Sequence, residues 1–156
     1  VGAISHELLG AGFSESLQVD ASVSYLSAAE AEAARQGHRD QFRSLYGDFV
    51  ELAPDVSSAD VVTLDRVVCC YPDMERLVTA SAGKARHLYG LVLPRERILT
   101  RVGVFLANLW FRIRGSDFRT FLHPDERVEA TVERCGFRRT SHRQTVLWQV
   151  LTYTRR

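Results

Sequence analysis

Apolar and polar positions follow two different periods along this chain. Continuous apolar, β-branched runs are typical of buried parallel strands, whereas apolar residues at three- and four-residue intervals indicate helices. In chain order the pattern predicts a helix ending near Leu9, a strand over Leu17–Val19, a helix over Ser22–Gln36, strands over Gln41–Tyr46 and Asp60–Cys70, a helix over Met74–Lys84, a strand over His87–Leu93, helices over Ile98–Ile113 and Pro124–Cys135, and β-rich runs over Phe137–Arg143 and Thr145–Thr154.

This alternation of strands and helices predicts one α/β domain over residues 1–156. It favours a Rossmann-like, mostly parallel sheet with helices on both faces. The last two β-rich runs are separated by a single residue. So short a connection joins only antiparallel strands, so we expect a C-terminal antiparallel hairpin.

The first twenty residues resemble the middle of a nucleotide-binding βαβ unit. Gly2 precedes the first helix, and the strand that follows it ends at Asp20. Glycine lets the backbone approach a ligand at a helix N-terminus, and an acid at the tip of the second strand accepts hydrogen bonds from ribose hydroxyls. Val1 is not a start methionine, and neither a strand nor a complete glycine loop precedes Gly2. We therefore expect the fold to lack its first strand.

Composition narrows the classes of function. The chain of 156 residues is 46% hydrophobic and 25% charged, with a net charge of +1, which argues against a nucleic-acid binder. Its three cysteines, Cys69, Cys70 and Cys135, match neither a disulfide framework nor a zinc-binding spacing. We expect the Cys69–Cys70 pair to be buried thiols in a reducing cytoplasm, and we expect no metal site. No apolar run reaches the length of a membrane span.

A parallel α/β sheet that ends in an antiparallel hairpin resembles the class I S-adenosylmethionine-dependent methyltransferases. The matching positions are in family order. Gly2 resembles the last glycine of the family's first motif, and Asp20 with Ala21 resembles the ribose-binding acid. Gly47-Asp48-Phe49 resembles the end of the third strand, beside the adenine. Asp65 to Asp73 resembles the fourth strand and the loop that faces the substrate. The resemblance covers essentially the whole chain.

The resemblance implies S-adenosylmethionine as the cofactor. It implies that the cofactor is bound by Gly2, Asp20, Ala21, Gly47, Asp48, Phe49 and Asp65. The later half, through Tyr71-Pro72, Phe118–Phe121, His123 and Trp148, is similar to the magnesium-protoporphyrin O-methyltransferase group. From that narrower similarity we carry over the cofactor and not the porphyrin.

Several of these residues have a second interpretation. Asp20 is either a ribose ligand or a surface acid that caps the next helix, and Asp48 is either an adenine-side residue or a turn aspartate. Phe49 packs on the adenine or fills the core. Tyr71 contacts the methyl acceptor or packs within its loop, and His123 is a general base or caps the helix that follows.

The apolar helix over Ile98–Ile113 has three interpretations. It is a lid over an apolar acceptor, a core or dimer helix, or an element that lies on a membrane surface. Arg101, Arg112 and Arg114 lie near its ends. They contact an anionic group of the substrate or extend into water.

Taken together, these observations predict methyl transfer from S-adenosylmethionine to a small or medium organic acceptor, with Tyr71 and His123 as the candidate catalytic residues. The alternatives are a nicotinamide-dependent oxidoreductase, which shares the glycine turn and the ribose acid, and an inactive, truncated Rossmann-like domain. The expected partner is a small molecule and not a nucleic acid, since the fourth strand lacks the Asn/Asp-Pro-Pro-aromatic motif of amino-methylating enzymes. Membrane-surface contact is less favoured, and the oligomeric state is left open.

Overall fold

A computed structural model describes residues 2–156, except for the side chain of Leu99. The chain forms two compact units, an N-terminal unit that ends at Pro54 and a C-terminal unit that begins at Asp55. Each unit has its own sheet, of two and four strands respectively. Among residues 2–156, no strand joins the two sheets.

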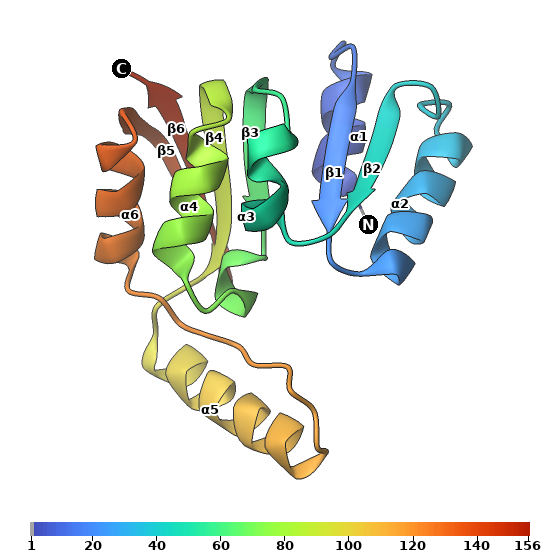
Figure 1. Cartoon of the computed structure of the whole chain (residues 1–156). Helices are drawn as coiled ribbons and strands as arrows, with labels where there is room; N and C mark the ends of the chain where they lie inside the picture. Colours follow the sequence, from blue (N-terminus) through green and yellow to red (C-terminus); the bar gives the residue numbers. More distant parts are fainter. Residues whose placement is uncertain (1) are drawn as a thin grey trace. The chain divides into compact units, whose positions relative to one another are not determined.

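The N-terminal unit is a parallel strand pair covered by two helices (Figure 1). Its elements are α1 (Ala3–Gly10), β1 (Ser16–Asp20), α2 (Val23–Arg35), β2 (Phe42–Tyr46) and a short α3 (Phe49–Leu52). The strands pair in register from Ser16 opposite Phe42 to Asp20 opposite Tyr46. The order and types of the predicted elements are confirmed here, apart from α3, whose four residues are too few to show a helical period.

The small core of this unit lies between α1, α2 and β2. Leu9, Ala29, Ala33 and Phe42 form its buried cluster. His6 of α1 is also buried, with 4% of its surface exposed. Its ring stacks on Phe42 at a centroid distance of 5.5 Å, and neither ring nitrogen has a hydrogen-bond partner among the described residues. The imidazole is therefore packed as an apolar ring.

The C-terminal unit is a four-stranded mixed sheet with the strand order β3-β4-β6-β5. Only β3 and β4 are parallel; β6 pairs antiparallel with both β4 and β5, which confirms the predicted hairpin. The elements are β3 (Ala59–Asp65), α4 (Met74–Ala82), β4 (Ala85–Pro94), α5 (Ile98–Ile113), α6 (Asp125–Arg134), β5 (Phe137–Gln144) and β6 (Trp148–Arg155).

The predicted strand over Asp60–Cys70 is wrong at its end. β3 stops at Asp65, Arg66 takes the left-handed conformation at φ 56°, and Val68–Cys70 is a 3₁₀ turn. The apolar run continues through this turn because Val68 is buried in the core. A hydrophobic pattern alone does not separate such a turn from a strand.

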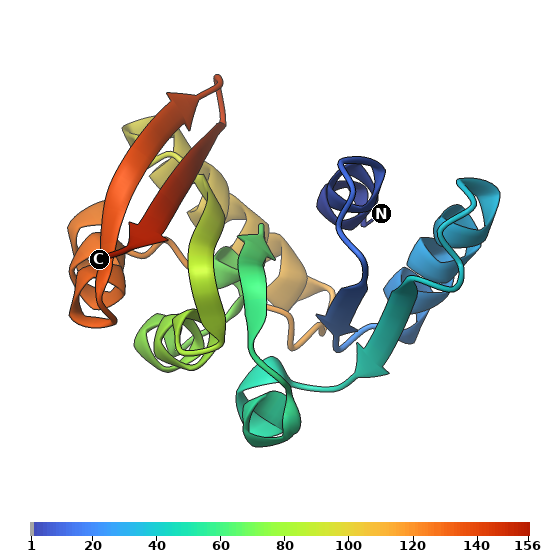
Figure 2. The same ribbon diagram turned by 90° about the horizontal axis from the view of Figure 1, so that it is seen from above.

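Helices α4 and α6 cover one face of this sheet (Figure 2). The core beneath them contains Tyr89, Phe137 and Tyr153, which are fully buried. The Tyr89 hydroxyl lies 2.7 Å from the Ser81 hydroxyl. Burial away from water raises the pKa of Tyr89 well above its usual value, so the phenol stays neutral at any physiological pH.

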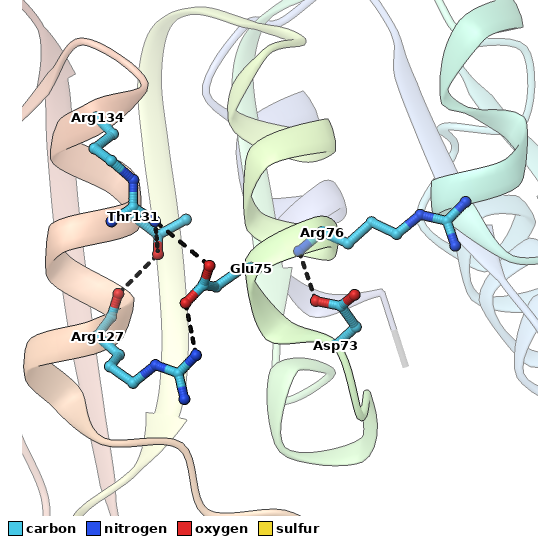
Figure 3. Close-up of polar contacts among 6 residues, drawn as sticks. All are labelled: Asp73, Glu75, Arg76, Arg127, Thr131 and Arg134. Carbon is cyan, nitrogen blue, oxygen red and sulfur yellow. Dashed lines mark hydrogen bonds and ion pairs between the residues drawn. The ribbon is translucent and has the colours of Figure 1, made fainter.

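Polar contacts link the exposed sides of α4 and α6 (Figure 3). Glu75 accepts a hydrogen bond from Arg127 at 2.7 Å and lies 3.7 Å from Arg134. At the start of α4, the carboxylate of the N-cap residue Asp73 accepts a hydrogen bond from the backbone N–H of Arg76 at 3.0 Å. Because exposed ion pairs contribute little to stability, the apolar faces beneath them hold the helices in place.

The longest helix, α5, lies beyond the carboxyl ends of β3 and β4 and away from the sheet (Figure 1). Most of its large apolar side chains are exposed, which excludes a core helix among the interpretations of this segment. No helix among residues 2–156 is long and apolar enough to cross a lipid bilayer.

We expect His6 to make the chain acid-sensitive. Burial lowers the pKa of His6 below its usual 6.5, with Glu32 opposing the shift and the neighbouring His38 and Arg35 adding to it. Below pH 6.5 the unfolded chain therefore binds more protons at this position than the folded chain, so stability falls as the pH drops through this range. His6→Phe preserves the packing on Phe42 without a titratable group.

Urea denaturation at pH 7.5 and pH 5.5, followed by circular dichroism, measures this effect. The midpoint of the wild-type chain should fall on acidification by more than the midpoint of His6→Phe. His87→Phe, at an exposed histidine, is the matched control and should fall as much as the wild type. An equal decrease of the urea midpoint in all three chains would contradict the assignment of the acid sensitivity to His6.

Candidate functional site

The ends of β1 and β2 bring most of the predicted cofactor residues together in the N-terminal unit. Asp20 is the last residue of β1, and its partner Tyr46 is the last residue of β2. The Gly47 N–H donates a hydrogen bond to the Asp20 carbonyl at 3.1 Å. Ala21 and Asp48 follow directly on the two strands, so the predicted acids stand at one edge of the pair.

The Asp20 carboxylate is held in one orientation. Its Oδ1 accepts a hydrogen bond from the Ser22 N–H at 2.7 Å. The Ser22 hydroxyl in turn accepts from the Tyr25 N–H at 3.4 Å and caps α2. No partner for Oδ2 of Asp20 is described among residues 2–156. One carboxylate oxygen thus supports the helix start, as the second interpretation of Asp20 predicts, and the other can accept a ligand hydroxyl.

Gly47 and Asp48 form the tight turn after β2. Gly47 has φ 145°, a conformation that side chains rarely adopt, and a Cβ at this position would lie 2.8 Å from Leu52 Cδ1. Asp48 caps α3 by accepting a hydrogen bond from the Val50 N–H at 2.8 Å. Phe49 is half-buried, which is compatible with both adenine contact and a place in the core.

Gly2 lies at the start of α1, beside β1. It has a left-handed conformation at φ 70°. A Cβ there would lie 3.0 Å from Gln18 Oε1 and 3.2 Å from His6 Nε2, so only glycine fits without displacing its neighbours. Its position at the helix N-terminus agrees with the predicted approach of backbone to ligand.

Two side chains near these residues were missed by the sequence analysis. Gln18 is two residues before Asp20 and its amide borders Gly2. Tyr46 is largely exposed at the end of β2, directly opposite Asp20. The signal in the sequence was the position of Tyr46, an aromatic residue directly before Gly47-Asp48 at the end of a predicted strand.

The predicted catalytic residues meet in the C-terminal unit through a backbone contact. His123 Nε2 lies 3.0 Å from the Tyr71 carbonyl oxygen. A carbonyl only accepts, so Nε2 carries the proton and Nδ1 is left with the lone pair. His123 does not cap α6, whose N-cap residue is Pro124. The imidazole is therefore fixed in the tautomer that presents Nδ1 as a base.

The segment before α6 is held against the turn after β3. The Phe121 N–H donates to the Cys69 carbonyl at 2.6 Å, and the Phe121 ring stacks on His123 at 6.0 Å. A small cavity of about 10 Å³ lies between these segments, which is room for about one water.

Asp65 stands at the end of β3, at the same edge of the sheet as Tyr71. It is exposed and forms an ion pair with Arg66, whose Nε lies 3.2 Å from the Asp65 Oδ1. The Arg66 guanidinium lies 5.7 Å from the centre of the Trp148 ring. Asp65 is thus the last residue of the strand, and Arg66 directly follows it.

Two further findings bear on the site's chemistry. Among residues 2–156, no group of three His, Cys, Asp or Glu side chains is placed to hold a metal ion. A hollow of about 450 Å³ in the N-terminal unit is lined by α2 residues such as Ser27 and Glu30 and by Arg39 of the loop that follows, and it includes none of the predicted site residues.

The adjacent thiols of Cys69 and Cys70 are half-buried rather than buried as predicted. Their sulfur atoms lie 3.8 Å apart. A hydrogen bond from Cys69 lowers the pKa of Cys70 to about 7, while the same contact and burial raise the pKa of Cys69. Cys70 is therefore the thiol with the larger thiolate fraction at neutral pH.

Comparison with known proteins places the fold. No protein-family model and no curated protein sequence matches the chain. Solved structures do: magnesium protoporphyrin IX methyltransferase from Synechocystis PCC 6803, determined with bound S-adenosylhomocysteine, has a TM-score of 0.79 at 17% identity, over 99% of this chain and 70% of that one. An O-methyltransferase family 2 protein from Planctomyces limnophilus, in complex with apigenin, has a TM-score of 0.75 at 15% identity, over 99% of this chain and 48% of that one.

A third similar structure is the mitomycin 7-O-methyltransferase MmcR, with a TM-score of 0.73 at 17% identity, over 99% of this chain and 46% of that one. This chain thus spans about half the length of two of these three proteins. These similarities confirm the predicted Rossmann-like α/β fold with its C-terminal antiparallel hairpin, although the sheet of the C-terminal unit is mixed and not mostly parallel.

We expect Cys70 to react with iodoacetamide at pH 7 faster than Cys135, because the thiolate is the nucleophile. Cys69→Ala removes the hydrogen-bond donor and should slow alkylation of Cys70 by about tenfold, the change in thiolate fraction when the pKa returns to about 8.5. Cys69→Ser retains a donor and should preserve the reactivity. Peptide mass spectrometry after timed labelling gives each rate, with Cys135 as the internal control. An unchanged Cys70 rate in Cys69→Ala would refute the hydrogen-bond explanation.

Proposed function

We propose that this chain binds S-adenosylmethionine at the carboxyl ends of β1 and β2 and transfers its methyl group to a small or medium organic acceptor. Two lines of support are independent of each other. The fold is that of solved methyltransferases over 99% of the chain. The residues at the strand ends also have the chemistry that a nucleoside requires, and this second line can be tested residue by residue.

The observation that carries the proposal is the oriented carboxylate of Asp20 beside the glycine turn at Gly47. Oδ1 is held by the Ser22 N–H, which leaves Oδ2 to accept from a ribose hydroxyl. The Gly47 turn has no side chain to block a flat base, and Asp48 and Phe49 follow it. Ala21 and Gly2 complete the N-terminal set that we assign to the cofactor.

In the C-terminal unit we assign Asp65 to the cofactor and Tyr71 and His123 to the acceptor. Bound S-adenosylmethionine supplies an electrophilic methyl group on a sulfonium. The chain's part is to align the acceptor for in-line displacement and to remove its proton where it is an alcohol. His123 fits that role because its Nε2–H is fixed on the Tyr71 carbonyl, which leaves Nδ1 basic.

The acceptor class is supported by the proteins that share the fold. Their names and bound compounds include a porphyrin, apigenin and mitomycin, all small or medium organic molecules. We propose an acceptor of this size class for the present chain, and not a nucleic acid, in keeping with its net charge of +1.

We also propose that the two units work as one methyltransferase-like domain over residues 1–156, because similar structures align with 99% of the chain. Its three cysteines are free thiols, which accords with the reducing cytoplasm as the proposed location.

Asp20→Asn tests the cofactor site. The amide oxygen can still accept from the Ser22 N–H, so the start of α2 is preserved, but the negative charge toward the ribose is lost. We expect the affinity for S-adenosylhomocysteine to fall by about 10- to 100-fold, the worth of a hydrogen bond to a charged group. Isothermal titration calorimetry measures this loss. Asp40→Asn, at an exposed aspartate before β2, is the matched control and should bind like the wild type.

NADH is the comparator in the same titration. Binding of NADH without binding of S-adenosylhomocysteine would replace the proposal with the oxidoreductase alternative. A folded chain that binds neither compound would favour the inactive domain.

A further inference from the structure

Helix α5 presents its apolar side to the solvent. Ile98, Phe105 and Ile113 are 80%, 68% and 72% exposed. Val102, Leu106, Leu109 and Trp110 are exposed as well. These residues recur at three- and four-residue intervals, so they form one continuous stripe over four turns.

The opposite side of α5 faces its own chain. Asn108 donates to the Thr120 carbonyl and accepts from the Thr120 N–H, each at 2.8 Å, and Phe111 meets Phe118 edge to face at 5.2 Å. The half-buried residues Thr100, Val104 and Ala107 share this side. The helix is thus fixed to the returning segment by its inner side, and its apolar stripe points outward.

The charges around the stripe are almost all positive. Residues 98–113 include no acid, and residues 95–119 hold six arginines against Glu96 and Asp117. This stretch therefore has a net charge of +4 in a chain whose total is +1. Arg101 and Arg112 flank the stripe on one side, and the Arg114 guanidinium lies 4.5 Å from the centre of the Trp110 ring on the other.

We propose that α5 is a membrane-surface helix that lies flat on an anionic lipid bilayer with its apolar stripe among the acyl chains. An exposed apolar side with tryptophan and phenylalanine, bordered by arginines, has the chemistry of the bilayer interface. With 16 residues, α5 does not cross the bilayer. Charge complementarity favours this occupant over a second copy, because pairing two such stripes brings arginine borders together without acids on the helix to balance them.

This inference is independent of the proposed methyl transfer, since it uses no residue of the cofactor site. On a bilayer surface, the helix that follows β4 holds the carboxyl edge of the C-terminal sheet close to the lipid. An apolar acceptor dissolved in the bilayer would then lie near Tyr71 and His123.

Co-sedimentation of the full chain with lipid vesicles tests the proposal. We expect partition into phosphatidylcholine vesicles with about one third phosphatidylglycerol to exceed partition into pure phosphatidylcholine by about tenfold, and to weaken as salt is raised. In a Trp148→Phe background, the fluorescence of Trp110 should shift to the blue when anionic vesicles are added.

Two pairs of substitutions locate the surface. Phe105→Asp with Leu109→Asp places two charges in the stripe and should abolish vesicle binding. Val146→Asp with Leu147→Asp is the matched control, because both residues are exposed apolar side chains in the β5–β6 turn, and binding should persist. Arg112→Gln with Arg114→Gln should remove most of the preference for anionic lipid. Circular dichroism verifies that each variant is folded.

Three results would overturn the proposal. The first is that the folded wild-type chain does not bind vesicles, and the second is that it binds neutral and anionic vesicles equally. The third is that the control pair Val146→Asp with Leu147→Asp loses as much vesicle binding as Phe105→Asp with Leu109→Asp. Light scattering tests the competing occupant, a second copy of the chain. If the wild-type chain does not bind vesicles but forms a dimer, and Phe105→Asp with Leu109→Asp disrupts that dimer, the stripe is a dimer interface.

Discussion

Parallel strand pairing is the constraint on which each unit of this protein depends. Parallel neighbours cannot be joined by a tight turn, so a helix must cross between them and both strands end at the same edge. In the N-terminal unit, the register that places Asp20 opposite Tyr46 therefore brings Ala21 beside Gly47. In the C-terminal unit, the pairing of β3 with β4 places Asp65 opposite Val92. The site residues are neighbours because the backbones pair, and no contact between their side chains is needed.

The turns that follow these strands depend on local backbone geometry. Gly47 adopts a φ that few other residues tolerate, and the chain can then start α3 with Asp48 as its cap. After β3 the same reversal is made by Arg66, a non-glycine residue in the left-handed region. Such residues cost energy and persist where the surroundings fix them, here through the Arg66 N–H on the Val92 carbonyl at 3.1 Å.

Much of the fold could be predicted from the sequence because its helices and strands have strong periods. The boundary after Asp65 could not, since Val67 and Val68 continue the apolar pattern through a turn. For the site, the strand-end acids were within reach of sequence reasoning, whereas the bond between His123 and the Tyr71 carbonyl joins residues 52 positions apart. The exposure of α5 was also beyond reach, because periodicity identifies an apolar side and does not say what covers it.

The segment between β4 and α6, which contains α5, is anchored to the C-terminal unit at both of its ends. The Arg95 N–H donates to the Leu147 carbonyl, and the Asp125 N–H donates to the Glu96 carboxylate at 3.3 Å. A segment anchored at both ends can change length at little entropic cost to the rest of the fold. The residues from Arg97 to about Thr120 can therefore change in length or surface chemistry without disturbing the strand pairing of the sheet that anchors them.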